Sequence, residues 1–395
     1  MNREELVNLP IEWKRGSGLS KSDLKEDGKN KCILYGELYT KHKKLLITSS
    51  NISRTNKIGT IVSKRGDILI PGTSTASKKD MLLAREIDED GVFLGGDINI
   101  IRPSKGLFAK KYLPYYFETL SAFDQLDKYI TGATGIIHLS NTGIKKLKVP
   151  LPSFQEQQRI VSILDEAFDA IEKAKENAEK NLKNSRELFK SYLQGVFENK
   201  CERWEKKKLG DVCSLYQGIA INSKTKHALV EKSDLPLLRI KDLKNNTVEQ
   251  YIDPNNYPTN ALVNQEDIIY TRTGSLGLVF KGKRGVLHNN AFKVVPNSKI
   301  TNDYLFHWLQ NPAFKAKIMR LALKAAQPDI THAIFKTQEI SIPSIEDQNI
   351  IVEKIDALRS EIQKLEAIYQ KKIQELEELK KSFLQKAFRG ELKTN

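Results

Sequence analysis

The sequence contains one stretch twice, and this repeat constrains the fold more than any other feature. The first copy covers residues 152–197 and the second covers residues 343–388, at a constant offset of 191. Pairing the copies without a gap gives 16 identities in 46 positions, where about 3 are expected by chance at average composition. A repeat of this length predicts two similar halves in tandem.

Each copy of the repeat is predicted to be one long amphipathic helix, because apolar side chains recur at spacings of three and four residues. Ser153 and Ser344 stand three residues before an acidic residue, close to the capping-box pattern that begins a helix. A helix of this length is on the order of 65 Å long, so one small domain cannot cover it. The residues predicted to pair are Ile160, Leu164, Ile171, Leu188, Tyr192, Ile351, Ile355, Ile362, Leu379 and Phe383.

Two arrangements satisfy such helices. They pair with each other, which we favour, or each packs only within its own half. Both copies lose the heptad spacing at the same point, at Asn181 and Lys372, where the apolar residue moves on to Leu182 and Ile373.

The composition favours a polyanionic partner. The chain has 64 Lys and Arg residues against 49 Asp and Glu residues, a net charge of +15, and a basic excess of this size is typical of nucleic-acid binding. Its three cysteines, Cys32, Cys201 and Cys213, have no metal-ligand spacing and fit a reducing cytoplasm. No signal pattern or membrane-length apolar run occurs, so we expect a soluble, cytoplasmic protein.

The segments around the repeats are predicted to be globular and of mixed α and β content, an α+β fold. We expect a first module at 1–147, a long helix with its lead-in at 148–198, a second module at 199–338 and a second helix at 339–395. The segment 66–70 recurs as 266–270, and Tyr112-Leu113 recurs as Tyr304-Leu305; Trp204 also echoes Trp13 at the offset of 191. Strands are expected at 33–35, 45–47, 58–62, 67–70, 92–94 and 98–101.

Catalytic motifs are weak. The run Asn311-Pro312-Ala313-Phe314 resembles the catalytic motif of adenine methyltransferases but lacks its second Pro, so it is interpreted as a turn between helices. Asp329 and Glu339 have the spacing of a nuclease metal pair without its Lys, and no phosphate-binding Gly-Lys-Ser/Thr loop exists. We therefore expect no enzymatic activity in this chain.

Clusters of polar and basic side chains give the better functional signal, because phosphate oxygens accept hydrogen bonds from such groups and Arg can bind guanine through two bonds. For each residue taken singly, a solvated surface group is the favoured interpretation; the clustering in both modules favours DNA binding. The candidates are Lys41, Lys43, Lys44, Ser49, Asn51, Arg54, Thr73, Ser74, Lys78 and Lys79 in the first module, and Arg272, Thr273, Ser275, Lys281, Lys283, Arg284, Asn289 and Asn290 in the second.

With these features in place, the chain resembles the specificity (S) subunit of type I restriction–modification systems. The resemblance rests on the helix lead-in and start at 149–157, its weaker copy at 340–348, the terminal run 387–392, and the strand–loop elements at 67–69 and 267–275. It spans the full chain. The first module has Pro71-Gly72-Thr73 where Arg272 stands in the second. This difference argues against a shared mode of recognition at that loop.

The resemblance implies a non-catalytic subunit with two target recognition domains, each reading one half of a split DNA site. Its two long helices would pair as an antiparallel coiled coil and set the unread spacer. The implied partners are double-stranded DNA, two methyltransferase (M) subunits and restriction (R) subunits, with no membrane. The chain itself would bind no cofactor, since S-adenosylmethionine, ATP and Mg would be bound by the partner subunits.

Two alternatives stay open at this point. The chain could be a coiled-coil protein-interaction scaffold without DNA specificity; a stand-alone methyltransferase is disfavoured by the missing motifs. The helix ends at 192–197 and 383–388 are either a docking surface for partner subunits or buried against the modules.

Overall fold

The computed structural model describes residues 2–75, 77–132, 135–198, 203–323 and 328–392. They form two compact units, one made of Met1–Ala178 with Lys371–Asn395 and the other of Glu179–Gln370. We call the globular part before helix α5 module 1, and the globular part between α5 and α10 module 2. The boundary expected at 198/199 and the cysteine at 201 adjoin or fall within 199–202, outside the described residues.

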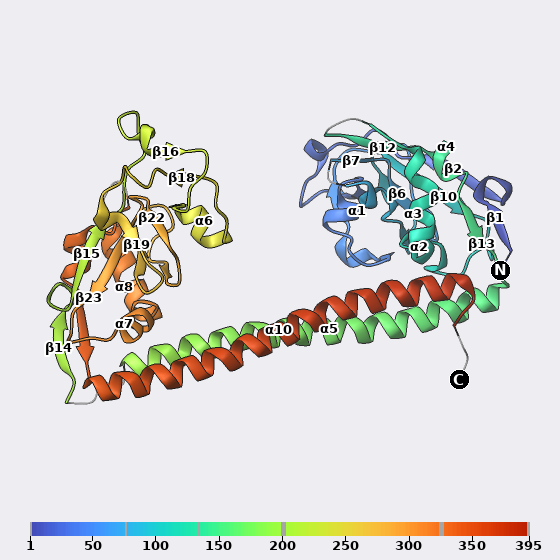
Figure 1. Ribbon diagram of the computed structural model, residues 1–395. Helices are drawn as coiled ribbons and strands as arrows, with labels where there is room; N and C mark the ends of the chain where they lie inside the picture. Colours follow the sequence, from blue (N-terminus) through green and yellow to red (C-terminus); the bar gives the residue numbers. More distant parts are fainter. Residues whose placement is uncertain (1, 76, 133–134, 199–202, 324–327, 393–395) are drawn as a thin grey trace. The chain divides into compact units, whose positions relative to one another are not determined.

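Module 1 is built around a mixed five-stranded sheet with the strand order β2-β10-β6-β8-β4 (Figure 1). Smaller sheets, β11-β12-β7, β5-β3-β9 and β1-β13, flank it. The elements are β1 (Arg3–Glu5), η1 (Leu6–Asn8), β2 (Ile11–Arg15), η2 (Lys21–Asp23), β3 (Asn30–Ile33), α1 (Glu37–Thr40), β4 (Leu46–Ile47), η3 (Ser49–Asn51), β5 (Ser53–Thr55), β6 (Ile68–Pro71), β7 (Thr73–Ser74), η4 (Lys78–Leu82), β8 (Arg85–Ile87), β9 (Phe93–Leu94), β10 (Ile98–Pro103), α2 (Tyr112–Phe117), α3 (Leu120–Leu126), η5 (Asp127–Tyr129), β11 (Ile130–Thr131), β12 (Ile137–Leu139), α4 (Asn141–Ile144), β13 (Lys148–Pro150) and α5 (Phe154–Glu198).

Module 2 is built around a four-stranded sheet with the order β15-β23-β20-β21, flanked by β17-β22-β19, β16-β18 and β14-β24. Its elements are β14 (Glu205–Lys208), η6 (Leu209–Asp211), β15 (Cys213–Gln217), η7 (Lys226–Ala228), β16 (Leu229–Val230), β17 (Leu237–Leu238), α6 (Ile240–Asn245), β18 (Tyr251–Ile252), η8 (Thr259–Ala261), β19 (Leu262–Val263), β20 (Ile268–Thr271), β21 (Val279–Phe280), β22 (Gly285–Leu287), β23 (Ala291–Pro296), α7 (Asn302–Leu309), α8 (Pro312–Ala322), α9 (His332–Lys336), β24 (Glu339–Ile342) and α10 (Ile345–Arg389).

The central sheets of the two modules correspond strand by strand. In module 1, β10 pairs antiparallel with β2 and β6; in module 2, β23 pairs antiparallel with β15 and β20. Ile68 faces Ile101 as Ile268 faces Val294, which confirms the predicted recurrence of 66–70 as 266–270. The echo of Trp13 in Trp204 is wrong: Trp13 lies inside β2, opposite Ile101, whereas Trp204 precedes β14.

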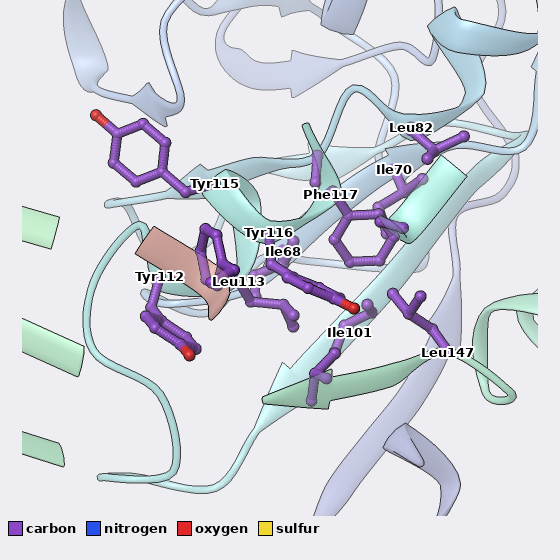
Figure 2. Close-up of a cluster of buried hydrophobic side chains, with 14 of the residues drawn as sticks. Ile68, Ile70, Leu82, Ile101, Tyr112, Leu113, Tyr115, Tyr116, Phe117 and Leu147 are labelled. Carbon is purple, nitrogen blue, oxygen red and sulfur yellow. The ribbon is translucent and has the colours of Figure 1, made fainter. Parts of the chain in front are cut away.

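Aromatic side chains of α2 form the core of module 1 over its sheet. Figure 2 shows Tyr116 and Phe117 lying against Ile68, Ile70 and Ile101, and all five are at most 2% exposed. Burying such side chains contributes about 1.5–3 kcal/mol each, so this layer fixes α2 on the sheet.

Each module shares its core with both long helices. Module 1 buries Ile160 and Leu164 from the start of α5 together with Leu384 and Phe388 from the end of α10. The Phe388 ring lies 5.2 Å from the Tyr112 ring, centre to centre. Because the start of one helix and the end of the other enter one core, the two helices run antiparallel within this unit.

Module 2 repeats this arrangement with the helices exchanged. Its core holds Leu193 and Phe197 from the end of α5 and Ile355 from the start of α10. The Phe197 and Tyr304 ring centres are 5.5 Å apart. The open question about the helix ends is thus answered for Leu193, Phe197, Leu384 and Phe388, which are buried against the modules.

A buried glutamine at the start of each helix adds hydrogen bonds to the same attachment between helix and module. Gln157 accepts from the Ala109 N–H at 2.9 Å and donates to the Leu107 carbonyl at 3.2 Å. Gln348 accepts from the Thr301 N–H at 2.7 Å and donates to a backbone carbonyl of the same loop at 3.2 Å. Both side chains are at most 1% exposed. We call this set of contacts, with the aromatic pairs above, the joint of each module.

One position of the joint differs between the halves. Asp165 of α5 accepts a hydrogen bond from the Tyr115 hydroxyl at 2.6 Å, and Asp356 of α10 lies 2.9 Å from His307 Nε2. Burial, reinforced by the positive charge of Arg359, lowers the pKa of His307 below its ordinary value of 6.5. Burial and the bond to Asp165 raise the pKa of Tyr115 instead.

Outside the joints the helices contact each other through charges and aromatic rings. In the first unit Lys175 lies 2.8 Å from Glu377, and the Lys380 ammonium is 4.9 Å from the Phe168 ring centre. These contacts pair rising numbers on α5 with falling numbers on α10, as an antiparallel pair requires.

The second unit has the corresponding contacts, but here the residue types are exchanged: the positions of the cations on one helix are taken by the anion or the ring on the other. Arg186 lies 3.3 Å from Glu366, and the Arg359 guanidinium is 5.0 Å from the Phe189 ring centre. At the offset of 191, each cation of one unit corresponds to the anion or ring of the other. The correspondences are Lys175 with Glu366, Glu377 with Arg186, Phe168 with Arg359, and Lys380 with Phe189.

Most residues predicted to pair lie on the inner side of the helices, but two do not. Leu188 and its repeat Leu379 are 57% and 43% exposed, while Ser185 and Ala178 are buried. The heptad spacing is lost at the predicted point, Asn181 and Lys372. Leu188 and Leu379 follow that point and therefore face solvent. The buried Ser185 hydroxyl is satisfied by the Leu182 carbonyl at 2.9 Å. The remaining predicted positions are buried or partly buried: Ile160, Leu164, Ile171, Tyr192, Ile351, Ile355, Ile362 and Phe383.

Two local predictions have clear outcomes. The helices begin where the capping pattern placed them, since Ser153 and Ser344 accept from the Glu156 and Asp347 N–H groups at 3.3 and 3.1 Å. The strand expected at 58–62 is wrong, because only an isolated bridge from Val62 forms there. No helix in the described ranges is long and apolar enough to cross a membrane.

We expect Gln157→Ala to lower the free energy of unfolding of its unit by about 1–3 kcal/mol, because it leaves a buried N–H and a buried carbonyl without partners. Urea unfolding measures the loss, and amide hydrogen exchange of α2 localises it. Gln155→Ala is the matched control, since Gln155 is exposed on the same helix turn. Equal losses in the two variants would contradict the role of Gln157.

Acidification should loosen the joint of module 2 selectively. A histidine whose pKa is lowered in the folded state stays neutral there while the unfolded chain takes up a proton, so stability falls as pH drops through and below 6.5. We expect the amide protection factors of α7, which allow for the slower intrinsic exchange at low pH, to fall between pH 7.5 and 5.5 more than those of α2, and His307→Tyr, which copies Tyr115, to reduce this difference. An unchanged pH profile in the variant would refute the assignment to His307.

Candidate nucleic-acid interface

Lys41 and Arg54 line one cleft of about 410 Å³ on module 1. Lys41 Nζ donates to Ser53 Oγ at 2.8 Å and lies 3.5 Å from the Glu37 carboxylate. Arg54 Nη1 donates to the Gly28 carbonyl at 2.8 Å. The structure therefore brings these two candidates together, with part of their hydrogen-bonding capacity already used.

The neighbouring candidates of module 1 are open to solvent. Lys43 and Lys44 are exposed in the loop between α1 and β4, and Ser49 and Asn51 are exposed on η3 just after β4. No hydrogen bond or ion pair holds the two ammonium groups to other described residues. They are the least committed cations of this cluster and can neutralise phosphates.

The remaining candidates of module 1 are separate from that cluster. Thr73 and Ser74 are buried in β7, where Thr73 Oγ1 lies 3.2 Å from His138 Nδ1 of β12. Lys78 forms an ion pair with Asp127 at 2.7 Å.

Lys79 lies in a different place again. It lines a mostly apolar cavity of about 280 Å³, together with Leu82 and Phe117 of module 1 and Leu384 of α10. This candidate therefore faces the helix side of the module.

In module 2 the structure brings Arg272, Thr273, Asn289 and Asn290 together. The N–H groups of Arg272 and Thr273 both donate to the Asn290 carbonyl, at 2.9 and 3.3 Å. The Asn289 carbonyl accepts from Gln217 at 2.6 Å. Ser275 lies in the same loop after β20, and its carbonyl accepts from the Thr271 hydroxyl. These candidates form one cluster at the end of β20.

Arg272 is also paired with Asp329. Its Nε lies 2.9 Å from Asp329 Oδ1, and its Nη2 donates to Oδ2 of the same carboxylate. Asp329 therefore serves as an arginine partner, and no group of three or more His, Cys, Asp or Glu among the described residues is placed to hold a metal ion. Asn311, the start of the methyltransferase-like run, caps α8 through a bond from the Ala313 N–H at 2.9 Å, which confirms its interpretation as a turn.

Lys281, Lys283 and Arg284 lie at the opposite end of the sheet from Arg272. Lys281 pairs with Glu266 at 3.2 Å, just before β20 begins, and with Asp303 of α7. Lys283 donates to Asn246 at 2.6 Å, and Arg284 lies 3.7 Å from Asp234. The two candidate clusters thus lie at opposite ends of β20.

The loop after β20 has a counterpart with the same backbone bonds in module 1. Gly72 N donates to the Asp97 carbonyl at 2.6 Å, and its own carbonyl accepts from Leu139 N at 3.0 Å. Arg272 N donates to the Asn290 carbonyl at 2.9 Å, and its carbonyl accepts from Ile330 N at 3.0 Å. The frame is therefore repeated while its side chains differ.

The sequence reasoning missed several polar residues around this frame. Arg15 at the end of β2 pairs with Asp97 at 2.7 Å, and Gln217 occupies the corresponding end of β15. His138 stands in module 1 where Asp329 stands in module 2, at the offset of 191 that the repeat itself supplies. That offset could have indicated that His138 and Asp329 correspond. The correspondence of Arg15 with Gln217 becomes apparent only from the sheet register.

Comparison with known proteins assigns both halves of the chain to one family. A family model described as the type I restriction modification DNA specificity domain matches residues 4–180 and again 201–378. The chain is 23% identical over 307 residues to the type I restriction enzyme MjaVIII specificity subunit of Methanocaldococcus jannaschii, covering 71% of this chain and 70% of that protein. The putative type I restriction enzyme MjaX specificity subunit of the same organism is 22% identical over 83% of this chain and 79% of its own length.

Solved structures share the fold. A chain from work on complex assembly and conformational transition of the type I R–M system is similar with a TM-score of 0.78, at 17% identity, covering 97% of this chain and 98% of that one. The HsdS subunit from Thermoanaerobacter tengcongensis has a TM-score of 0.58 at 17% identity and 97% coverage of both chains.

We expect Lys43→Ala with Lys44→Ala to reduce the salt dependence of non-specific duplex binding. Each phosphate contact contributes about −0.9 to the slope of log K against log salt, so loss of both should make the slope shallower by about 1.8. Fluorescence anisotropy of a labelled duplex over a salt series measures it. Lys364→Ala with Lys371→Ala removes the same net charge from α10, where both lysines already pair with glutamates; an equal change in this control would contradict a local contact.

Proposed function

Because this chain belongs to the type I restriction–modification DNA specificity family, we propose that it is the non-catalytic subunit that selects the DNA sequence for such a complex. In this proposal it reads a bipartite DNA site and docks methyltransferase and restriction subunits. The catalytic cofactors, S-adenosylmethionine, ATP and Mg, bind to those partners, and the complex works in the cytoplasm.

The proposal assigns one target recognition domain to residues 1–147 and the other to residues 199–338. Residues 148–198 and 339–395 form the spacer helices with their lead-ins. The family model matches each half separately, which supports two recognition domains of one kind.

One observation carries the proposal: the two modules share the joint to the helices but differ at the far end of their central sheets. Gln157 and Gln348 make equivalent bonds, and Tyr112 and Tyr304 each donate a bond to the lead-in strand at 3.0 Å. The polar side chains around Gly72 and Arg272 have no such correspondence. A constant attachment with a variable polar end is what reading two different half-sites requires, because base edges are distinguished by side-chain donors and acceptors.

The net charge of +15 and the uncommitted Lys43 and Lys44 support the DNA partner through phosphate neutralisation. Base contacts then supply discrimination, at about 1–3 kcal/mol for each wrong base pair. Two short readings by one chain multiply their selectivity.

The test is single-molecule mapping of methylated adenines in cells that carry this chain together with a type I methyltransferase subunit. We expect a split motif with two fixed halves and a constant gap, absent from cells with the methyltransferase subunit alone. The purified chain by itself should transfer no methyl group to DNA; transfer by the pure chain would overturn the non-catalytic assignment.

A companion measurement separates the alternatives if no new methylation appears. Duplex binding by the purified chain that weakens steeply with salt supports a DNA subunit whose methyltransferase partner was mismatched. Absence of salt-dependent duplex binding would instead support a protein-interaction scaffold.

A further inference from the structure

Both modules hold an arginine against an aspartate at the same end of the central sheet, although the two residues come from different elements. Module 1 supplies Arg15 from β2 and Asp97 from the residue before β10. Module 2 supplies Arg272 from the loop after β20 and Asp329 from the segment before α9. The strand register places Arg15 at the position of Gln217 and Asp97 at that of Asn290, so neither pair is inherited residue by residue.

The geometry of Arg272 leaves one hydrogen-bonding edge available. A guanidinium has five N–H donors in a planar fork. Asp329 takes the side edge, through Nε and Nη2, and Nη1 makes no hydrogen bond with any described residue. The outer edge, formed by Nη1 and the second Nη2 hydrogen, is therefore held in a fixed plane, and no residue in the described ranges uses its donors.

Arg15 is held in a similar way in module 1. Its Nη2 donates to Asp97 Oδ1 at 2.7 Å, its side chain is 49% exposed, and its other N–H groups make no bonds within the described chain. The arginine cannot stand where Arg272 does, because module 1 has Gly72 there. A Cβ on Gly72 would lie 2.9 Å from the Asp97 carbonyl oxygen.

This end of the sheet is remote from the joint. In module 1, β10 starts beside Asp97 and runs for six residues, about 20 Å, before the chain reaches Ala109, which bonds to α5. Figure 1 shows β7 and β12, which border this end, on the side of module 1 away from the helices. In module 2, β23 runs in the same sense from Asn290 to the loop that Gln348 holds.

An arginine fixed by a carboxylate suits a base edge better than a phosphate. The aspartate cancels most of the positive charge that would attract a phosphate and repels its negative charge. The planar fork remains, and guanine presents two neutral acceptors, O6 and N7, at matching spacing in the major groove.

We propose that these are the two guanine-reading sites of the chain: Arg15, positioned by Asp97, reads a guanine in one half-site, and Arg272, positioned by Asp329, reads a guanine in the other. This assignment rests on the proposed function. Asp97 and Asp329 are positioning residues, which fix the plane of the fork without contacting the base.

The experiment maps methylated adenines in cells with the full chain and a type I methyltransferase subunit, comparing the wild type with Arg15→Ala and Arg272→Ala. We expect each variant to lose selectivity for guanine at one position of one half-site by about 10- to 100-fold, with the other half-site unchanged and the two variants affecting opposite halves. Arg65→Ala is the matched control, since the exposed Arg65 also pairs with an aspartate, Asp88, but precedes β6, at the opposite end of that strand from Gly72; it should leave the motif unchanged.

Three results would overturn the assignment. The wild-type motif could lack a G:C pair in either half; Arg15→Ala and Arg272→Ala could leave every position as selective as before; or both could alter the same half-site. Each of these requires a wild-type bipartite motif, so it is distinct from failure of the proposed function, in which the wild type yields no motif and its DNA binding is independent of salt.

A structural role is tested by Arg272→Lys and Asp329→Asn. Lysine keeps the charge next to Asp329 but lacks the planar fork, so we expect normal complex formation and thermal unfolding with guanine selectivity reduced almost as far as in Arg272→Ala. Asp329→Asn keeps the fork but loosens it, and should give an intermediate loss. If Arg272→Ala abolishes the complex while Arg272→Lys retains full guanine selectivity, the pair is only a structural staple and the proposal fails.

Discussion

The fold of each half depends on one joint, in which a phenylalanine from the end of one long helix packs against a tyrosine of the module attached to the other. Phe388 meets Tyr112, and Phe197 meets Tyr304, with each tyrosine hydroxyl bonded to the lead-in strand. Removing a buried Phe side chain costs about 3–5 kcal/mol, so this contact makes the helix pair part of each module's core. The helix is therefore not a tether: a module without both helices would expose the aromatic face of its core.

That dependence explains which residues the two halves share. The identical positions concentrate where the joint is made, at the glutamine near the helix start and at the Leu, Gln and Phe near the helix end. At the far end of each sheet only the backbone bonds around Gly72 and Arg272 recur. Packing selects residues for their shape and burial. In the proposed function, the far ends of the sheets read two half-sites of different sequence, which demands different side chains.

The sequence predicted the parts of the molecule that depend on local periodicity. The long helices and their starting residues follow from spacing and capping patterns, and the strand at 67–70 with its recurrence at 266–270 follows from the comparison of the two halves; the structure has these elements as α5, α10, β6 and β20. It failed where a contact depends on sheet register. Arg272 was recognised as a candidate, but its partner Asp329 lies 57 residues further along the chain. Arg15 was missed because its correspondence with Gln217 becomes apparent only from the sheet register, and the match of Trp13 with Trp204 aligned β2 with a residue that precedes β14.

The lost heptad spacing shows a second limit of pattern reading. Leu188 and Leu379 fit the apolar stripe in the sequence pattern, yet both are exposed in the structure. A fixed heptad count accumulates an offset of about 20° per heptad on a straight helix, and the slip at Asn181 and Lys372 adds a residue's rotation. Beyond the slip, the small Ser185 is buried while Leu188 is exposed.

The exchanged charges between the helices determine which helix pairs with which. In an antiparallel pair of two α5 helices, Lys175 would face Arg186. In an antiparallel pair of two α10 helices, Glu377 would face Glu366 and Lys380 would face Arg359. Every ionic contact seen between α5 and α10 would thus become a repulsion. Each such contact is worth only about 0.2–1 kcal/mol, but attraction is replaced by repulsion at every one, so the differences add. The joint does not make this distinction as strongly, because its main helix residues, Gln157 and Gln348 at the starts and Phe197 and Phe388 at the ends, are identical in both copies. The duplicated ends therefore supply the stability of the pair, and the diverged charges between them favour pairing of α5 with α10 over pairing of either helix with a copy of itself.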